Sequence, residues 1–151
     1  MKFDVENYRY PSRRSVVFAK HGMVCTSAPL PAQAGLDVLR RGGNAIDAAI
    51  ATAAALTVME PVSNGIGGDA FALVWTGGKL YGLNASGYSP KAISAELLRS
   101  RGLTAVPKRG WEATMVPGVP GGWAALSQRF GSMPLSELVE PAARYAEEGV
   151  R

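Results

Sequence analysis

The sequence predicts a mixed domain of the α+β or α/β class, and three observations support this prediction. Residues 45–58 are apolar on every side of a helix, which is typical of a helix buried between layers. Residues 70–76 and 79–84 are apolar-rich runs joined by two glycines, which indicates a β-hairpin. The 18 glycines and 10 prolines among 151 residues indicate frequent turns. Because so short a chain has little with which to enclose the buried helix, we expect residues 1–151 to form a single, partial domain.

The composition excludes several classes of protein. An apolar share of 47% excludes an intrinsically disordered chain, and a single cysteine excludes a disulfide framework. The net charge of +4 arises from basic residues that occur as scattered pairs: Arg13–Arg14, Arg40–Arg41 and Lys108–Arg109. A nucleic-acid-binding surface needs clustered charge, so we expect no nucleic-acid partner.

The apolar segments indicate neither a secretory leader nor a membrane span. Residues 1–15 contain acidic residues and lack an apolar core, so they do not resemble a signal peptide. The longest apolar run, residues 48–59, is interrupted by Thr52 and Thr57 and is shorter than the roughly 20 residues that cross a bilayer. We therefore expect a cytoplasmic protein with no membrane partner.

The first elements expected along the chain are two short strands and a helix. Residues 15–19 and 23–27 are rich in β-branched residues and predict a hairpin or two paired strands. A helix is expected over residues 31–41, with Leu36 and Leu39 on its buried face. The two glycines directly after it are a common helix stop.

The apolar helix over residues 45–58 has clear start and end signals. Asn44 is a favourable N-cap, and Asp47 lies three residues later, near the positive end of the helix. We expect Asp47 to be structural, so that its replacement by alanine lowers stability by about 0.5–2 kcal/mol. Glu60 and Pro61 end the helix.

The chain after the hairpin is expected to be helical, with one irregular stretch. A short helix is predicted over residues 94–101, where a serine precedes it and a glycine follows it. Residues 103–122 are rich in Gly and Pro and predict irregular structure. Two further helices are expected over residues 122–129 and 135–148, the second disturbed at Pro141.

The glycine-rich loop at residues 65–68 is the first candidate for a binding site. It lies between a helix and a strand, whereas nucleotide-binding glycine loops lead from a strand into a helix. No lysine follows it in the P-loop position, so we expect no phosphate ligand. The preferred interpretation is that glycine permits close backbone packing beneath the buried helix.

Single reactive residues do not reveal an active site. His21 is the only histidine and lies in a predicted turn, so we expect no metal site and no cofactor. Cys25 has no evident partner base and is expected to be a small buried residue in a strand. Asp47 and Glu60 each lack a neighbouring carboxylate for acid–base chemistry.

A set of ordered motifs is more informative than any single residue. In chain order they are GMVCTS at residues 22–27, QAG at 33–35, GGNAIDAA at 42–49, EP at 60–61, GIGGDAF at 65–71, VPGVPG at 116–121 and GSMPL at 131–135. Together they closely resemble the N-terminal part of the gamma-glutamyltranspeptidase family, and the resemblance runs from about residue 17 to residue 151.

This resemblance implies a fold and a mechanism. Members of the family are N-terminal-nucleophile hydrolases with a four-layer αββα sandwich, of which this chain would hold an incomplete part. Their precursor cuts itself into a large and a small chain, and the new N-terminal threonine of the small chain is the nucleophile, with its own α-amine as base. The resemblance thus implies no catalytic residue in this chain, no activity of the chain alone, and the small chain of the same precursor as partner.

The resemblance also implies one substrate position within this chain. Transpeptidases have an arginine after the second hairpin strand that grips the α-carboxylate of the γ-glutamyl donor. Ser86 stands at that position, and Tyr88 occupies the place where some relatives have an arginine instead. Both are candidate substrate-binding residues, and both could equally be plain loop residues. Neither side chain supplies a fixed positive charge.

The sequence is therefore expected to be part of a glutathione-hydrolase-type amide hydrolase and acyltransferase that acts on a small-molecule amide. A relative that acts on another small amide, such as an oxamate-type amidohydrolase or an acylase, is the alternative that the missing arginine favours. A non-catalytic or truncated homologue is the remaining alternative. The donor, the acceptor and the balance between hydrolysis and transfer stay open.

Overall fold

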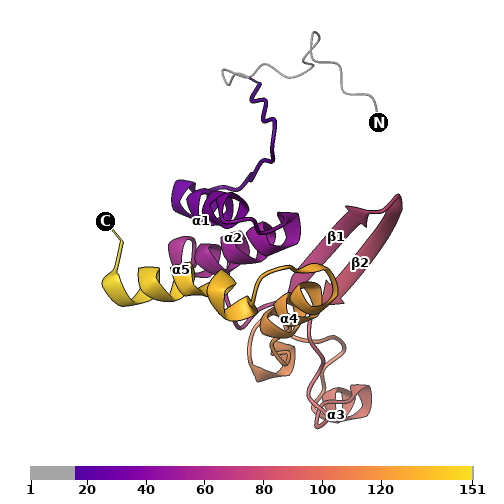
Figure 1. Ribbon diagram of the computed structural model, residues 1–151. Helices are drawn as coiled ribbons and strands as arrows, with labels where there is room; N and C mark the ends of the chain where they lie inside the picture. The colour runs from indigo at the N-terminus through magenta and orange to yellow at the C-terminus, as the bar shows by residue number, and fades with distance from the viewer. Residues whose placement is uncertain (1–15, 151) are drawn as a thin grey trace.

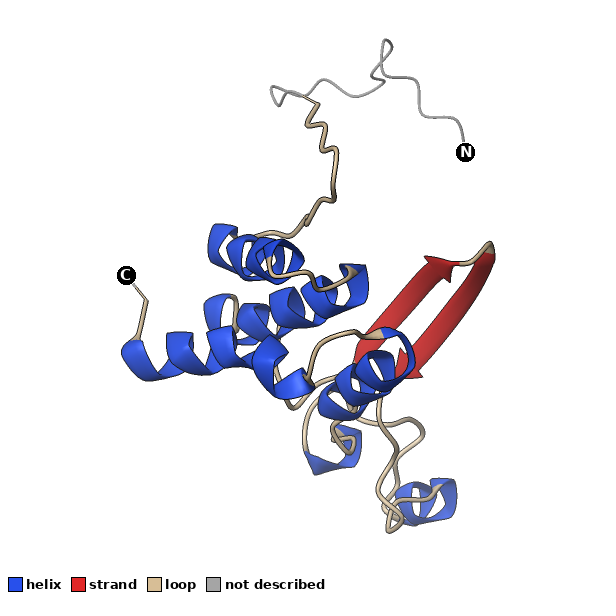
Figure 2. Cartoon of the chain, in the orientation of Figure 1, coloured by secondary structure: helices blue, strands red, loops and turns tan. Residues whose placement is uncertain are grey.

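The computed structural model describes residues 16–150. Residues 1–15, in which we expected no secretory leader, and residue 151 lie outside the described residues. In chain order the elements are α1 (Pro29–Arg40), α2 (Ala45–Met59), β1 (Ala70–Thr76), β2 (Lys79–Ala85), α3 (Ala95–Ser100), the 3-10 helix η1 (Trp111–Ala113), α4 (Val119–Phe130) and α5 (Leu135–Glu148). Helices α1, α2 and α5 lie together, and the hairpin projects beside α4 (Figures 1 and 2). None of the described helices is long and apolar enough to cross a membrane.

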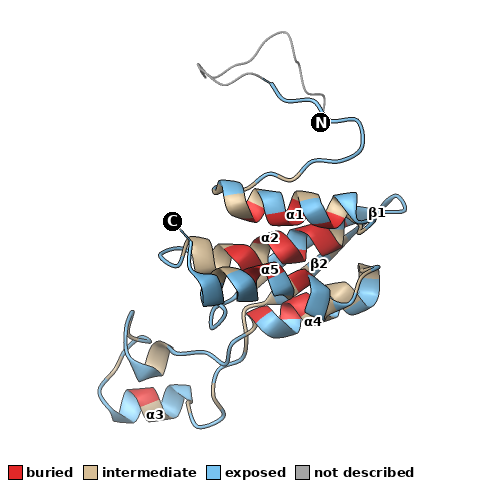
Figure 3. Cartoon of the chain, turned by 60° about the vertical axis from the view of Figure 1, so that its left-hand side comes forward, coloured by how far each residue is buried: buried red, intermediate tan, exposed pale blue. Residues whose placement is uncertain are grey.

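Helix α2 is the central helix, as predicted. The Asn44 side chain caps it by accepting hydrogen bonds from the backbone N–H groups of Ile46 and Asp47, at 2.8 and 3.1 Å. Helices α1 and α5 pack along α2, and α4 adds a smaller contact (Figure 3). The buried residues of α2 are Asp47, Ala48, Ile50, Ala51, Thr52, Ala54 and Ala55. Three helices of the same chain thus supply most of the cover that we expected it to lack.

Helix α1 begins two residues earlier than predicted and buries a different face. Its buried residues are Pro31, Ala34, Gly35 and Val38. Leu36 and Leu39, the predicted buried pair, are only half-buried at the edges of this face. A Cβ on Gly35 would overlap the Thr52 hydroxyl of α2. The buried face is therefore the one whose small residues allow the two helices to approach closely, rather than the one with the largest side chains.

The two strands predicted before α1 do not form. Within the described residues, the stretch from 16 to 28 is in no strand and pairs with no strand. A strand requires a partner for its backbone N–H and C=O groups, and among the described residues the sheet consists of β1 and β2 alone. Cys25, which we expected to be buried in one of these strands, is exposed because no second strand or helix covers it.

The predicted hairpin forms, with β1 and β2 antiparallel along their whole lengths. Both residues of its turn, Gly77 and Gly78, have positive φ, 57° and 72°, as a tight two-residue turn requires. Val74 is buried on the face toward α4. The opposite face carries large apolar side chains that are exposed: Phe71, Leu73, Trp75 and Leu80. We call these four side chains the open hairpin face.

Helices α4 and α5 differ from the prediction at their prolines. Helix α4 begins at Val119, three residues earlier than predicted, because Pro120 occupies a first-turn position that needs no N–H donor. Helix α5 continues through Pro141 without a break, although we expected a disturbance there. Pro141 is buried with Leu138 on the inner face of α5. Packing of this face outweighs the backbone hydrogen bond that the proline removes.

Asp47 ties the start of α2 to the turn between α4 and α5. Its carboxylate is completely buried and accepts hydrogen bonds from the Asn44 N–H (2.9 Å), the Ser132 N–H (3.1 Å) and the Ser132 hydroxyl (2.6 Å). The Asn44 side-chain amide donates to the Phe130 carbonyl oxygen at 2.6 Å. Burial by itself raises the pKa of Asp47, but the hydrogen bonds from Ser132, Asn44 and Met133 hold this pKa below its usual value. Asp47 therefore joins distant parts of the chain as well as capping a helix.

Candidate functional site

Ser86 and Tyr88 lie in one pocket, where β2 ends and where the chain returns to begin α4. The pocket has a volume of about 520 Å³. One wall consists of residues 83–88, and the other consists of residues 116–118 with Gly121 and Gly122. None of the described residues that line the pocket has a charged side chain. The structure therefore brings the two predicted residues together in an uncharged site.

Local hydrogen bonds fix the loop that carries Ser86. The Ser86 N–H donates to the Asn84 side-chain oxygen Oδ1 at 3.0 Å, which forms a turn directly after β2. The Tyr88 carbonyl oxygen accepts a hydrogen bond from the Val116 N–H at 2.8 Å. The Tyr88 side chain is 82% exposed, whereas Ser86 is half-buried. The pocket thus offers a ligand two hydroxyl groups and the Asn84 amide, and no cation from its described lining.

The two walls of the pocket touch through their backbones, which was not predicted from the sequence. Gly87 has a φ of +82°, and a Cβ at this position would overlap the Val116 carbonyl oxygen. A Cβ on Gly118 would overlap the Ala85 carbonyl oxygen, and one on Gly122 would lie 2.7 Å from the Ala85 Cβ. The available signal was the glycines at the start of α4, Gly118 before its first residue and Gly122 in its first turn, because two backbones touch only where a side chain is absent.

The glycine loop before β1 does not pack as predicted. A Cβ on Gly65 or Gly67 would meet nothing within 4 Å, so close backbone packing does not explain these two glycines. The loop acts instead through a carbonyl oxygen, since Gly68 accepts hydrogen bonds from the N–H groups of Gly118 (3.1 Å) and Val119 (3.3 Å). It therefore holds Gly118, which belongs to the second wall of the pocket, and Val119, the first residue of α4.

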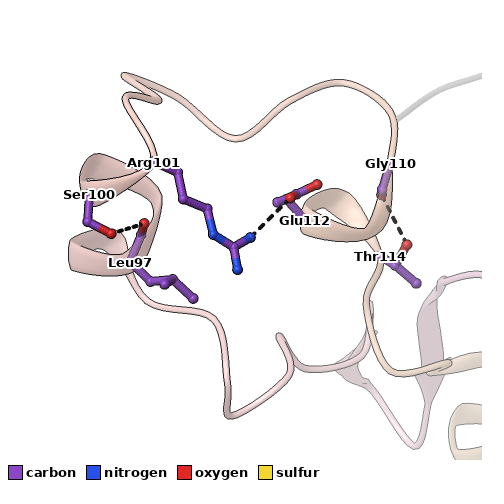
Figure 4. Close-up of polar contacts among 6 residues, drawn as sticks. All are labelled: Leu97, Ser100, Arg101, Gly110, Glu112 and Thr114. Atoms are coloured by element: carbon purple, nitrogen blue, oxygen red, sulfur yellow. Dashed lines mark hydrogen bonds and ion pairs between the residues drawn. The ribbon is translucent and has the colours of Figure 1, made fainter.

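An arm of residues 89–115 extends away from the hairpin and α4 and then returns to them (Figure 1). It contains α3 and η1, and its two ends meet at the hydrogen bond between Tyr88 and Val116. Within the arm, Arg101 forms an ion pair with Glu112, with 3.2 Å between Nη1 and Oε1 (Figure 4). This ion pair joins the residue that follows α3 to η1, so the arm has its own internal contacts and meets the rest of the chain at the rim of the pocket.

The other residues considered from the sequence do not line this pocket. His21 is exposed in a bend before α1, in agreement with the predicted turn. Glu60 ends α2, and its carboxylate accepts hydrogen bonds from the Ser27 hydroxyl (2.7 Å) and the Asn64 amide (3.0 Å). Among residues 16–150, no group of three or more His, Cys, Asp or Glu side chains is arranged to hold a metal ion.

Known proteins resemble this chain over most of its length. The family model described as Gamma-glutamyltranspeptidase matches residues 31–151. A glutathione hydrolase-like proenzyme of Bacillus subtilis is 38% identical over 90% of this chain and 26% of its own length. The crystal structure of a cephalosporin acylase from Bacillus halodurans is 59% identical, with a TM-score of 0.87 over 99% of this chain and 28% of that one. The structure of Helicobacter pylori gamma-glutamyltranspeptidase is 35% identical, with a TM-score of 0.79 over 89% of this chain and 40% of that one.

The chain spans about a quarter of the length of the curated relatives that it matches. The region that it matches is the N-terminal part of the large subunit. Proteins named glutathione hydrolases and proteins named acylases are both among the matches. The substrate must therefore be argued from the pocket.

Proposed function

The chain belongs to the gamma-glutamyltranspeptidase family, and we propose that it forms the N-terminal part of the large chain of an enzyme that cleaves amide bonds. In this proposal the precursor cuts itself, and the new N-terminal threonine of the small chain attacks the substrate carbonyl. The amine of that threonine takes the hydroxyl proton and passes it to the leaving amine, and the acyl group then moves to water or to a second amine. The observation that carries the proposal is the close superposition on two solved relatives.

The open hairpin face supports the proposal of a partner chain. Its four side chains are 61–78% exposed and lie on one side of a two-stranded sheet. Each large apolar side chain gains about 1.5–3 kcal/mol on burial, so such a face favours a covering layer. The B. subtilis relative is about four times as long as the matched region. We propose that the small chain of the same precursor completes the sandwich, which leaves this chain inactive by itself.

The pocket of Ser86 and Tyr88 is the proposed site for the acyl part of the substrate. Burying a carboxylate without a cation is costly unless other hydrogen bonds replace that cation. The described lining offers hydroxyl groups, the Asn84 side-chain amide and backbone groups, but no cation. A γ-glutamyl donor, whose α-carboxylate is negative, is therefore expected to be a poor substrate unless the rest of the protein supplies a cation.

An acylase-type substrate is the second candidate, and two observations favour it. The pocket lining is uncharged where transpeptidases are expected to have an arginine. The identity to the protein described as a cephalosporin acylase is 59%, against 35% for the H. pylori transpeptidase. We therefore propose a small amide whose acyl group carries no carboxylate. An oxamate-type amide, which carries a carboxylate next to its amide carbonyl, would need a cation from the rest of the protein. A non-catalytic homologue would lack a threonine at the cleavage junction.

The proposed function is tested with the full-length protein and two chromogenic amides. γ-Glutamyl-4-nitroanilide carries an α-amine and an α-carboxylate, and butyryl-4-nitroanilide lacks both. We expect self-cleavage of the precursor and a higher kcat/KM for the butyryl amide. Ser86→Arg is expected to raise kcat/KM for the γ-glutamyl amide about tenfold, or about 1.4 kcal/mol of transition-state binding.

Ser86→Thr is the matched control, because it keeps the hydroxyl group and adds no charge. Absence of both self-cleavage and turnover of either amide would contradict the proposed enzyme. Efficient turnover of the γ-glutamyl amide by the unchanged protein, slowed by Ser86→Arg, would show that a cation from elsewhere fills this place. In that case the proposed substrate would be a γ-glutamyl donor of the glutathione type rather than an acylase-type amide.

A further inference from the structure

We propose that three glycines position Ser86 and Tyr88 and thereby decide which acyl groups the pocket accepts. These residues are Gly87, Gly118 and Gly122, and we call their contacts the glycine clasp. The inference rests on the proposed function, because it names what controls selectivity at the proposed acyl site. It concerns positioning, since none of the three has a side chain with which to bind a substrate.

The clasp brings the two walls of the pocket into direct contact at particular glycines. A Cβ on Gly118 would overlap the Ala85 carbonyl oxygen, and a Cβ on Gly87 would overlap the Val116 carbonyl oxygen. The hydrogen bond from the Val116 N–H to the Tyr88 carbonyl oxygen, at 2.8 Å, closes the contact at the arm. The two backbones therefore lie in direct contact on either side of Ser86.

Ser86 is held through both of its chain neighbours. Ala85 is in contact with Gly118 and Gly122, and Gly87 is in contact with Val116. The position of a side chain follows that of its backbone, so a shift at residue 85 also moves the Ser86 hydroxyl. A misplacement of about 1 Å in a site can reduce the rate of a reaction by as much as about 100-fold. Small changes at the clasp are therefore expected to alter substrate selectivity.

The glycine loop before β1 holds the second wall in place. The Gly68 carbonyl oxygen accepts hydrogen bonds from Gly118 (3.1 Å) and Val119 (3.3 Å), so the loop anchors the clasp residue at the start of α4. Glycine is required only at the positions where the two walls touch. Gly121 adjoins Gly122 in α4, yet a Cβ on Gly121 would meet nothing within 4 Å.

Gly122→Ala is the most informative change, because its methyl group would meet one atom too closely. That atom is the Ala85 Cβ at 2.7 Å, whereas the next neighbours, on Leu83 and Ala70, lie at 3.6 and 4.0 Å. In the full-length protein we expect the ratio of kcat/KM for butyryl- and γ-glutamyl-4-nitroanilide to change about tenfold, with KM changing more than kcat. Adding Ala85→Gly removes the opposing methyl group and should restore the ratio to within about twofold of the unchanged protein.

Two further variants complete the test. Gly67→Ala is the matched control, since its methyl group would meet nothing within 4 Å and the residue lies outside the clasp. Its ratio should equal that of the unchanged protein. Asn84→Ala, at an exposed position, removes the acceptor of the Ser86 N–H and should shift the ratio without affecting folding. Self-cleavage and circular dichroism verify that each variant is folded.

A readout that does not depend on turnover separates the two proposals. The amide of Val116 is bonded to Tyr88 across the clasp, so its hydrogen exchange should be about tenfold faster in Gly122→Ala and restored in the double variant with Ala85→Gly. Three results would contradict the proposed role of the clasp. These are unchanged hydrogen exchange at Val116 in Gly122→Ala, an unchanged ratio of kcat/KM in folded Gly122→Ala, and a double variant that keeps the altered ratio. Inactivity of the unchanged protein together with the expected exchange pattern would instead overturn the proposed function.

Discussion

The helices α1, α2 and α5 differ from the hairpin and its pocket in how completely the described chain buries them. Helix α2 packs against α1, α5 and α4, and the polar groups at its start are paired through Asn44 and Asp47. The hairpin buries Val74 against α4 but leaves its opposite face open. The helices are thus buried by other residues of this chain, whereas one face of the hairpin has no covering layer within the described residues.

The largest effect is expected for Asp47→Ala. The substitution leaves the partly buried donors of Asn44 and Ser132 without their acceptor, and an unpaired donor costs up to about 1–3 kcal/mol. We expect a loss of about 3 kcal/mol in the free energy of unfolding. This exceeds the cost of losing a helix cap alone. Urea denaturation of the full-length protein measures it.

Asp37→Ala is the matched control for this prediction. Asp37 is an exposed carboxylate on α1 that bonds only to Gln33 and Arg40 within the described residues, so its loss should change stability by less than about 0.5 kcal/mol. Turnover per folded molecule should be nearly unchanged in both variants. A several-hundredfold loss of rate in Asp47→Ala at an unchanged Tm would place Asp47 in the active site instead.

Gly35→Ala is expected to cost about 2 kcal/mol by overpacking the contact between α1 and α2. Its methyl group would overlap the Thr52 hydroxyl and lie 3.1 Å from the Ala48 carbonyl oxygen. Gly67→Ala adds the same methyl group in open space and should lower stability little or not at all. Equal Tm values for the two variants would mean that the helices are not packed as closely as the structure has them.

Acid should weaken the helices through Asp47. Hydrogen bonds hold its folded-state pKa below the ordinary value of 3.8, so the unfolded chain takes up the proton first as the pH falls. The stabilisation is complete above about pH 5 and is lost progressively as the pH falls through the folded-state pKa. Unfolding free energies measured from pH 6 to pH 2 should therefore fall less steeply in Asp47→Ala than in the unchanged protein. If the unfolding free energies of the two proteins fall equally with pH, Asp47 is not the cause of the acid sensitivity.

The smallest effect on the 151-residue chain alone is expected at the open hairpin face. Trp75 is 71% exposed, so Trp75→Lys should change the stability of this chain by less than about 0.5 kcal/mol while reducing the binding of a hydrophobic dye. In the full-length protein the same change should cost about 3 kcal/mol or more, because Trp75 is then covered. Thr76→Lys, at the neighbouring exposed position, is the control. Equal losses for Trp75→Lys in the two proteins would argue against a covering chain.

Elements with local signals were predicted to within a few residues. Helix α2 has an N-cap at Asn44, and the hairpin has its turn at Gly77 and Gly78, so neighbours in sequence determine both. The strands predicted before α1 failed because a strand depends on a partner that no local pattern reveals. Residues of the pocket, Ser86 and Tyr88, were found through the family resemblance, and their role in binding stays a prediction.

The glycines show most clearly why part of the site could not be predicted. Gly65 and Gly67 were expected to allow close packing and lie in open space, whereas Gly118 and Gly122 were overlooked and touch residue 85. The sequence reports that a side chain is absent, and only the structure reports what lies opposite that position. The same reasoning applies to Asp47, whose capping role was visible in the sequence and whose bond to Ser132, 85 residues away, was not.

Amide hydrogen exchange, compared between the 151-residue chain and the self-cleaved full-length protein, tests the central claim most directly. The account predicts that α2 amides are protected in both proteins, because α1 and α5 cover this helix within the chain. Amides of β1 and β2 should exchange at least about tenfold more slowly in the full-length protein than in the 151-residue chain, because the open hairpin face is covered there. Equal protection of the hairpin amides from exchange in both proteins, or unprotected α2 amides in the 151-residue chain, would contradict this account.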